Sequence, residues 1–502
     1  MRSVSILIFV MVLIFGCTKE KAIKVETSDQ FTDELKELKT YFQIPGLAAS
    51  VQKDGELVYQ KYFGYSDLES KTKLDTTTLF PVASLTKVFS GVLIMKLAEE
   101  GKLSLDDPLQ KYLHNVKLND SILVKHILSH TSQGAIGKNF YYSYRFGALT
   151  AVIAEASKKP FDTYMHEAIF TPLGLKNTHL LKDSIQIAQN SLKIAKPYFL
   201  KDSITTGFID YGYSASAGIV SDINDLHIFN KALDNNTLIS EASKKLMFSG
   251  LDPSLPYSYG IFNQEFQGEN LIWGYGQYDC YSSLFLKVPS KKLTLTLLAN
   301  NNLMSDPARL IYGDAMSSLF ALSFLKNYVF LEPEMALFEN QESLKSSADY
   351  ASTDIYRKKL LAQALASSFM AQFDNQHIEI SEVLLNKTFS EFPDYLQYAD
   401  LNLLHTLTFL KEVTFYKELG EFDQFDEKIE AISAKLLKVD PEHPYVNVYM
   451  GVYHDRKGNQ EKAFYHFKQI VEADNFSKFW YTSEAMNWIA KNKPDYNMSN
   501  AK

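Results

Sequence analysis

A serine and a lysine three residues apart, Ser84 and Lys87, are the residues of this chain best suited to nucleophilic chemistry. A lysine one helical turn after a serine lies on the same helix face, where its amine reaches the hydroxyl. Burial lowers the pKa of a lysine, and the neutral amine then acts as a base. The S-x-x-K spacing therefore predicts a serine nucleophile that is activated by a lysine.

Sequence context separates this pair from the other matches to the same pattern. Ser84 follows Phe80-Pro-Val-Ala and precedes apolar residues at helical spacing over residues 88–100, with Gly101 as a helix stop. A helix N-terminus offers unpaired N–H groups and positive potential, which stabilise an alkoxide or an acyl oxyanion. A serine that merely caps the helix is the alternative, which the motif alone leaves open. The other S-x-x-K matches begin at Ser50, Ser70, Ser323 and Ser499.

Two predicted hairpins frame the region that contains this pair. Apolar runs flank Asp54-Gly55 near the start of the region, and residues 282–288 and 293–299 flank a Pro-Ser-Lys-Lys turn near its end. Strands at both ends with helices between them predict an α+β domain over residues 31–325, whose terminal strands share one sheet.

The chain changes character after residue 325, where strand patterns and turn glycines nearly vanish. No glycine occurs between Tyr328 and Gly420, and helical patterns predict an all-α domain over residues 326–502. The spacing around Tyr449, Gly458 and Phe467 resembles one tetratricopeptide unit, and residues 429–437 suit the second helix of a preceding unit. A generic helical bundle remains the alternative. A lone unit cannot bury its own face, so neighbouring helices must complete the stack.

Short segments in a fixed order mark residues 31–325. They are Ile44-Pro-Gly-Leu, Asp54-Gly-Glu-Leu-Val-Tyr, Phe80-Pro-Val-Ala-Ser-Leu-Thr-Lys, Gly101-Lys-Leu-Ser-Leu-Asp-Asp-Pro, Ile127-Leu-Ser-His-Thr-Ser, Pro172-Leu-Gly-Leu-Lys-Asn-Thr and Ser216-Ala-Gly-Ile-Val-Ser-Asp. This ordered set resembles the serine β-lactamase and penicillin-binding protein superfamily, especially its class C β-lactamase-like esterase and D-aminopeptidase branch. The resemblance implies a β-lactamase/transpeptidase-like antiparallel sheet with flanking helices and a helical subdomain, with the nucleophile at their junction.

The resemblance implies a second motif around Tyr142. This tyrosine matches the family's phenol, which shuttles protons beside the nucleophile after a nearby lysine has lowered its pKa. Core packing is the alternative role for Tyr142. Tyr144 stands where the family has an asparagine, and we expect Tyr144 and the following Arg145 to contact substrate.

The third motif is matched by Trp273-Gly-Tyr-Gly-Gln. Gly276 aligns with the family's glycine, and Gly274 then occupies the position of a basic residue that attracts a substrate carboxylate. Tyr275 and Gly276 are expected to line the substrate. The N–H groups of Ser84 and Gln277 are expected to form the oxyanion hole. An ordinary edge-strand segment is the alternative.

The first seventeen residues have the layout of an export signal. Arg2 precedes an apolar run over residues 4–15, which Gly16 and Cys17 follow. We interpret residues 1–16 as a lipoprotein signal peptide, Cys17 as the lipidation site and residues 17–30 as a tether; an ordinary signal peptide is the alternative. The protein is then an exported bacterial lipoprotein of the cell envelope, held to a membrane by its lipid. Cys280 is the only other cysteine, and we expect it to be packed.

Composition excludes several other classes of function. The net charge of −8 is spread along the chain and gives no reason to expect a nucleic-acid partner. Neither a phosphate-binding loop nor a dinucleotide fingerprint is present, and the His126/His130 pair lacks supporting carboxylates, so no cofactor or metal is expected.

These patterns together predict a serine hydrolase that forms an acyl-enzyme on a small-molecule or peptide substrate: an ester, an amide or a D-amino peptide. The altered second and third motifs favour an esterase or peptidase over an efficient β-lactamase. The alternative is a catalytically weak binding or scaffold protein whose C-terminal helices engage a protein partner.

Overall fold

The computed structural model describes residues 26–114, 121–338, 353–420, 422–473 and 479–497. The predicted signal peptide and Cys17 lie outside the described residues and stay predictions. Within the described ranges, no helix combines the length and apolar character that crossing a membrane requires.

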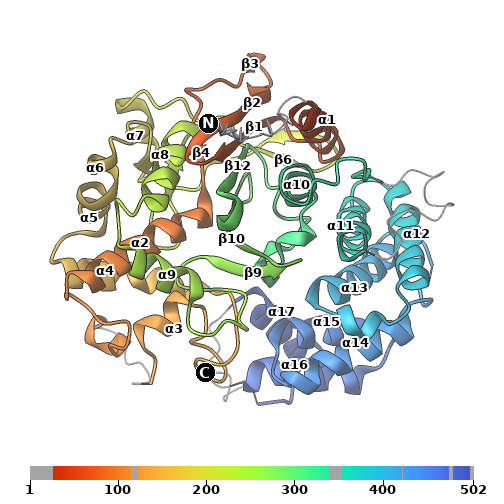
Figure 1. The fold of residues 1–502 in the computed structure, drawn as a ribbon. Coiled ribbons are helices and arrows are strands. Elements are labelled where there is room, and N and C mark those ends of the chain that lie inside the picture. Colours follow the sequence, from red (N-terminus) through yellow and green to blue (C-terminus); the bar gives the residue numbers. More distant parts are fainter. Residues whose placement is uncertain (1–25, 115–120, 339–352, 421, 474–478, 498–502) are drawn as a thin grey trace, which may run out of the picture.

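A seven-stranded antiparallel sheet is the centre of the N-terminal part (Figure 1). Leu47 in the first strand pairs with Ala299 in the last, so the two predicted hairpins are neighbours in one sheet, as expected. In spatial order the strands are β3 (Thr72–Lys73), β2 (Glu56–Asp67), β1 (Gly46–Lys53), β12 (Leu293–Ala299), β11 (Tyr281–Val288), β10 (Glu269–Tyr278) and β9 (Phe262–Phe266).

The central strands β11 and β12 are buried along their whole length, so both of their faces are covered. Helix α8 (Ile223–Asp234) packs against β1 and β12, while α1 (Glu26–Tyr41) and α10 (Leu319–Phe324) contact each other on the other side of the sheet (Figure 1). Two small sheets accompany the main one, formed by β4 (Phe80–Pro81), β8 (Ile219–Ser221) and β5 (His179–Leu180), and by β6 (Tyr198–Leu200) and β7 (Ile204–Thr206).

A helical subdomain lies between β4 and β9, with α2 at its centre. Helix α2 (Thr86–Glu99) confirms the helix predicted over residues 88–100, and Gly101 follows it with a φ of +66°. Nearly every α2 residue is buried, which explains a sequence that is apolar on all sides. The other helices are α3 (Val124–Leu128), α4 (Leu149–Ser157), α5 (Phe161–Met165), α6 (Thr171–Leu173), α7 (Ser184–Gln189) and α9 (Glu241–Ser249).

Helices alone make up the regular structure after residue 353 in the described residues, which confirms the predicted helical C-terminal region. Helices α15 and α16 follow each other across a short turn and pack together, in a helix-turn-helix arrangement. Their assignment as a tetratricopeptide repeat stays a prediction. The helices are α11 (Asp354–Met370), α12 (Gln376–Glu391), α13 (Leu401–Tyr416), α14 (Asp426–Val439), α15 (Pro444–Arg456), α16 (Gln460–Glu472) and α17 (Trp480–Asn492).

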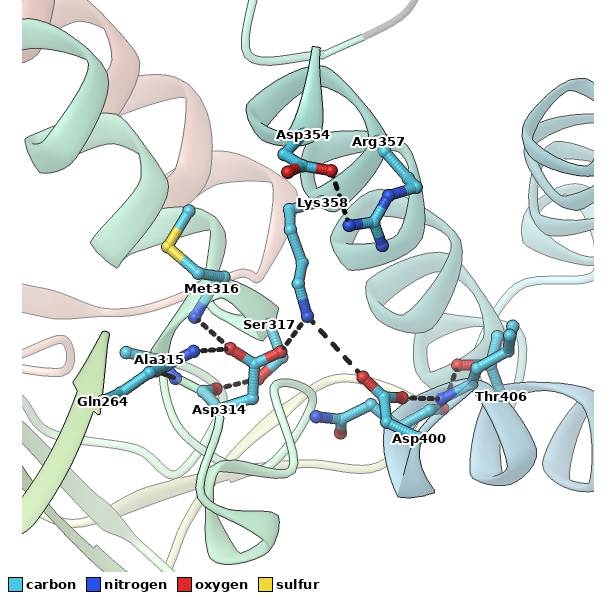
Figure 2. A network of polar contacts seen from close by, with 12 residues as sticks. Gln264, Asp314, Ala315, Met316, Ser317, Asp354, Arg357, Lys358, Asp400 and Thr406 are labelled. Atoms are coloured by element: carbon cyan, nitrogen blue, oxygen red, sulfur yellow. Dashed lines mark hydrogen bonds and ion pairs between the residues drawn. The ribbon is translucent and has the colours of Figure 1, made fainter. Parts of the chain in front are cut away.

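An ionic network joins the C-terminal helices to the sheet-bearing part of the chain (Figure 2). Lys358 of α11 donates to Asp314 at 2.6 Å and lies 3.6 Å from Asp400, the N-cap of α13. Gln264 of β9 donates to the other oxygen of Asp314 at 2.6 Å. Burial opposes the charge of Asp314, but the adjacent Lys358 outweighs it and lowers the pKa of that carboxyl. One lysine therefore connects three segments of the fold.

We expect Lys358→Ala to destabilise the protein by about 3 kcal/mol, because it leaves a mostly buried carboxylate without its cation. Urea unfolding monitored by circular dichroism measures the difference. Lys36→Ala is the matched control: its pair with Asp33 has side chains 58% and 74% exposed, so the loss there should stay below about 0.5 kcal/mol. Equal losses in the two variants would contradict a role for the network in holding the helices.

Candidate active site

Ser84 lies in a single 3₁₀ turn (Ala83–Leu85) that leads directly into α2. The preceding residue, Ala83, has a φ of +48°, a left-handed conformation that costs a non-glycine residue energy. A hydrogen bond of 2.9 Å from the Val82 N–H to the Ile219 carbonyl holds this turn against β8. The strained turn presents Ser84, which is only partly buried, at the junction of the sheet and the helical subdomain.

Lys87 is buried and points at Ser84. Its Nζ donates to the Ser84 Oγ at 3.0 Å and to the Ser216 carbonyl at 3.0 Å. Burial disfavours the ammonium form and lowers the pKa of Lys87 from 10.5 to about 7. A large fraction of the amine is therefore neutral at neutral pH, as a base for the serine requires.

Tyr142 also contacts the nucleophile, and its phenol forms a hydrogen bond with the Ser84 hydroxyl. The Lys87 Nζ lies 4.9 Å from the centre of the Tyr142 ring. We expected the lysine to lower the pKa of this phenol. That expectation is wrong: burial raises the pKa of Tyr142 and exceeds the lowering by the Ser84 hydrogen bond. Tyr142 therefore stays protonated at neutral pH, so it is available as a proton donor and not as a base.

His130 supports the Tyr142 ring. The two rings stack with centroids 4.3 Å apart, and the His130 Nδ1 accepts a hydrogen bond of 3.1 Å from the Ser143 N–H. Burial, and then the charge of Lys87, lower the pKa of His130 well below its usual value, so the imidazole is neutral. His130 thus fixes the orientation of Tyr142 without adding charge to the site.

The third-motif segment lies in β10 and passes directly beside the nucleophile turn. A Cβ atom on Gly276 would lie 1.9 Å from the Val82 carbonyl oxygen, so only glycine allows this approach. Gln277 follows Gly276 directly in β10 and pairs with Ser282 of β11; the role of its N–H in an oxyanion hole stays a prediction. At Gly274 a side chain would meet Leu85 and Val88 at 3.2 Å, so apolar groups take up part of the space of the family's basic residue.

Tyr144 and Arg145, the expected substrate contacts, are engaged by other groups. Tyr144 is 75% exposed and meets Phe479 edge to face, with ring centroids 4.8 Å apart. An N–H of the Arg145 guanidinium donates to the Ser132 carbonyl at 2.8 Å. A role for either residue in substrate binding stays a prediction.

Among the described residues, the lysines of the other S-x-x-K pairs are either ion-paired or exposed to solvent. Lys326 forms an ion pair with Glu34 at 2.5 Å, and Ser323 donates to the same carboxylate. Lys53 is exposed at the end of β1. The pair that begins at Ser499 lies outside the described residues.

Residues of the C-terminal helical region contact the loop that carries Tyr142, and the sequence did not predict this contact. The Tyr141 hydroxyl donates to the Asp440 carboxylate, and its ring meets that of His443 with centroids 5.5 Å apart. Further along, Tyr481 forms a hydrogen bond with Gln133. Tyr141 and Asp440 are 299 residues apart in the chain, and Gln133 and Tyr481 are further apart. No local sequence pattern predicts such a pairing.

We expect Tyr141→Phe to reduce stability by about 2 kcal/mol, because it orphans the buried Asp440 carboxylate. Since the same loop positions Tyr142, hydrolysis of a simple ester should also slow by about tenfold, as one hydrogen bond to a charged group is worth that much. Thermal unfolding and initial rates measure the two effects. Tyr496→Phe, which removes an exposed tyrosine–carboxylate bond to Glu472, is the control and should change neither value.

Comparison with known proteins agrees with this architecture. The Beta-lactamase family profile matches residues 31–314, and the chain belongs to that family. Members of this family share the fold of a superfamily of serine hydrolases. The chain is 26% identical to Protein flp of Staphylococcus aureus (strain MW2) over 305 residues, which cover 52% of this chain and 60% of that protein.

Another relative and a solved structure extend the comparison. The chain is 27% identical over 278 residues to the putative penicillin-binding protein PbpX of Bacillus subtilis (strain 168), covering 48% of this chain and 68% of that protein. The octameric penicillin-binding protein homologue from Pyrococcus abyssi has the same fold, with a TM-score of 0.55 at 23% identity over 67% of this chain and 81% of that one. The match thus spans about 60% of the length of the first curated relative.

Proposed function

We propose that the protein hydrolyses an ester or amide bond through an acyl-enzyme on Ser84. One observation carries the proposal: a buried lysine whose pKa is lowered to about 7 donates to the serine hydroxyl at 3.0 Å. Neither a capping serine nor a packed lysine needs such an arrangement, and a buried amine is costly to keep.

Acylation begins when the Ser84 Oγ attacks the substrate carbonyl carbon while its proton moves to the neutral Lys87 amine. The oxyanion that forms accepts hydrogen bonds from the N–H groups of Ser84 and Gln277. The carbonyl–leaving-group bond then breaks. The leaving group takes a proton from the phenol of Tyr142, and the Lys87 ammonium restores that proton.

Deacylation repeats these steps with water. The neutral Lys87 amine accepts a proton from the water molecule that attacks the acyl carbonyl. The bond between the acyl carbon and the Ser84 oxygen then breaks, and the Lys87 ammonium returns its proton to that oxygen. The acid is released, and the enzyme returns to its starting state.

The substrate preference that we propose follows from Gly274. No side chain there provides a positive charge for a substrate carboxylate, so esters, amides or D-amino peptides are favoured over penicillins as efficient substrates. Tyr275 and Gly276 of β10 would then border the bound substrate beside the oxyanion hole.

A fluorophosphonate probe tests the proposal because it reacts covalently with an activated serine. We expect mass spectrometry to locate the adduct on Ser84, and Ser84→Ala to lose both labelling and hydrolysis of p-nitrophenyl acetate. Ser50→Ala alters another S-x-x-K serine and should retain both. Equal labelling of Ser84→Ala would refute the nucleophile assignment. No labelling and no turnover in the wild type would favour the alternative, a binding or scaffold protein.

A further inference from the structure

The Lys87 amine is hydrogen-bonded to a tight backbone turn over residues 214–217. Two hydrogen bonds between Ser214 and Ala217 close this turn, one in each direction, at 2.9 and 3.3 Å. The Ser216 carbonyl, which shares a peptide unit with the Ala217 N–H, accepts from the Lys87 Nζ at 3.0 Å. The position of the turn therefore decides where the Lys87 amine is held.

Ala215 is the residue of this turn that other elements of the fold hold in place. It is fully buried, and side chains from two helices bind both of its backbone polar groups. Ser90 of α2 donates to the Ala215 carbonyl at 2.7 Å. Thr150 of α4 accepts from the Ala215 N–H at 2.8 Å. Because a buried polar group without a partner is costly, the turn cannot rotate away from either hydroxyl without a loss of stability.

The geometry of α2 explains why Ser90 reaches the same turn as Lys87. Ser84, Lys87 and Ser90 follow one another at intervals of three residues, and residues at this spacing lie on one face of a helix. Helix α4 packs against α2 and supplies Thr150 from its first turn. The nucleophile, the base and a hydroxyl that holds the turn thus share one helix face.

The Ser216 carbonyl is the acceptor that Lys87 can keep throughout the reaction. The other acceptor is the Ser84 Oγ, which becomes an ester oxygen in the acyl-enzyme. A carbonyl that holds one N–H of the neutral amine leaves the lone pair of Nζ free to face the nucleophile. It also favours the ammonium form, which opposes the effect of burial on the pKa of Lys87.

We propose that Ser90 and Thr150 are positioning residues, which hold the turn whose Ser216 carbonyl orients the base. By fixing that carbonyl, they keep the Lys87 amine directed at the nucleophile. This role rests on the hydrolase function proposed above. It makes the rate depend on two hydroxyl groups that act through the backbone of Ala215.

Thr150→Val tests the proposal, because valine has the shape of threonine but offers no acceptor to the Ala215 N–H. We expect kcat for p-nitrophenyl acetate to fall by about tenfold at unchanged KM, the factor that one hydrogen bond to a charged group is worth. The acid limb of the kcat/KM profile should move to lower pH by about one pH unit, because the ammonium loses an acceptor. Thr150→Ser keeps the hydroxyl and should restore both values. Thr40→Val removes a hydroxyl of α1 that donates to the Lys36 carbonyl, and it should change neither.

Ser90→Ala removes the other contact to Ala215 and should move kcat and the acid limb in the same directions. Since both hydroxyls act on one backbone residue, the loss of kcat in the double variant Ser90→Ala/Thr150→Val should be smaller than the product of the two single losses. Losses that multiply would refute a shared role. A lower kcat with an acid limb that stays near pH 7 would refute an effect on Lys87.

A direct titration of Lys87 separates this proposal from the hydrolase function. NMR of protein labelled with ¹³C at the lysine Cε follows the titration, and Lys87→Met identifies the signal by its absence. Thr150→Val should lower the pKa of Lys87 by about one pH unit here too. If p-nitrophenyl acetate is hydrolysed through Ser84 but this titration is the same in Thr150→Val, the positioning role is refuted and the hydrolase stands. If the titration shifts although no ester is hydrolysed, the hydrolase fails, while the hold of the turn on the Lys87 amine stands.

Discussion

Lys87→Met should lose about 10³-fold in kcat/KM for ester hydrolysis, because it removes the base that accepts the Ser84 proton. In the wild type, kcat/KM should rise with pH through an apparent pKa near 7, the value to which burial lowers that of Lys87. The neutral amine is the active form, so activity is lost below this pH. A profile that is flat between pH 6 and 8 would contradict the assignment of Lys87 as the base.

The same substitution should stabilise the fold at low pH. The pKa of Lys87 is about 7 when folded and 10.5 as a free side chain. The unfolded chain therefore binds more protons between these values, and stability decreases as pH falls from 10.5 to 7. The full pKa shift of Lys87 corresponds to a loss of stability of at most about 5 kcal/mol, which its replacement by methionine would relieve. The replacement also removes the hydrogen bonds to Ser84 and Ser216, and their loss reduces this gain.

We therefore expect Lys87→Met to raise the free energy of unfolding by about 2 kcal/mol at pH 6, which is the net result of these opposing contributions. The gain should shrink as pH approaches 10.5. Lys53→Met, at another S-x-x-K match whose lysine is exposed, should change neither stability nor rate. Urea unfolding at pH 6, 8 and 9.5 measures the trend, and a gain that does not depend on pH would contradict the linkage.

Gly276→Ala should reduce kcat by about 10²–10³-fold, the value of one oxyanion donor. Its Cβ would lie 1.9 Å from the Val82 carbonyl oxygen and 2.6 Å from the Ser283 Oγ. The backbone oxygen cannot rotate away as a side chain can, so β10 must move from the nucleophile turn. That movement separates the N–H of Gln277 from that of Ser84.

Gly274→Ala is the matched control for this prediction. Gly274 lies two residues earlier on the same strand, and a Cβ there meets only side-chain atoms of Leu85 and Val88 at 3.2 Å. These side chains can shift by a few tenths of an ångström, so we expect less than a tenfold loss. Steady-state kinetics with p-nitrophenyl acetate compares the two variants. Equal losses of kcat in Gly276→Ala and Gly274→Ala would show that β10 tolerates the movement that a Cβ on Gly276 forces. That result would contradict the assignment of the Gln277 N–H to the oxyanion hole.

Local patterns predicted the elements that carry the site. Turn residues between apolar runs identified both hairpins, and helical spacing identified α2. The sheet that joins the hairpins was also predicted, because an α+β domain must bury both of them. The separation of Ser84 from the other S-x-x-K serines rested on its position before α2, where the structure places it.

The sequence could not predict the features that depend on distant packing. The pKa values of Lys87 and Tyr142 depend on how deeply each side chain is buried. Burial lowers the pKa of the Lys87 amine and raises that of the Tyr142 phenol. The left-handed Ala83 has no sequence signal, because alanine rarely adopts that conformation. The contact between Tyr141 and Asp440 depends on how the C-terminal helices fold back onto the N-terminal part.

The pairing of β1 with β12 also dictates the order in which the chain can fold. Leu47 leaves the ribosome long before its partner Ala299 is synthesised. Until then one edge of β1 has no neighbour, and β11 and β10 are not joined to β1, because β12 lies between β1 and β11 in the sheet. Contacts of such long sequence separation slow folding and prolong exposure of unpaired strands. We therefore expect nascent chains that end before residue 293 to be inactive and to depend on chaperones, even though they already contain Ser84, Lys87 and Tyr142.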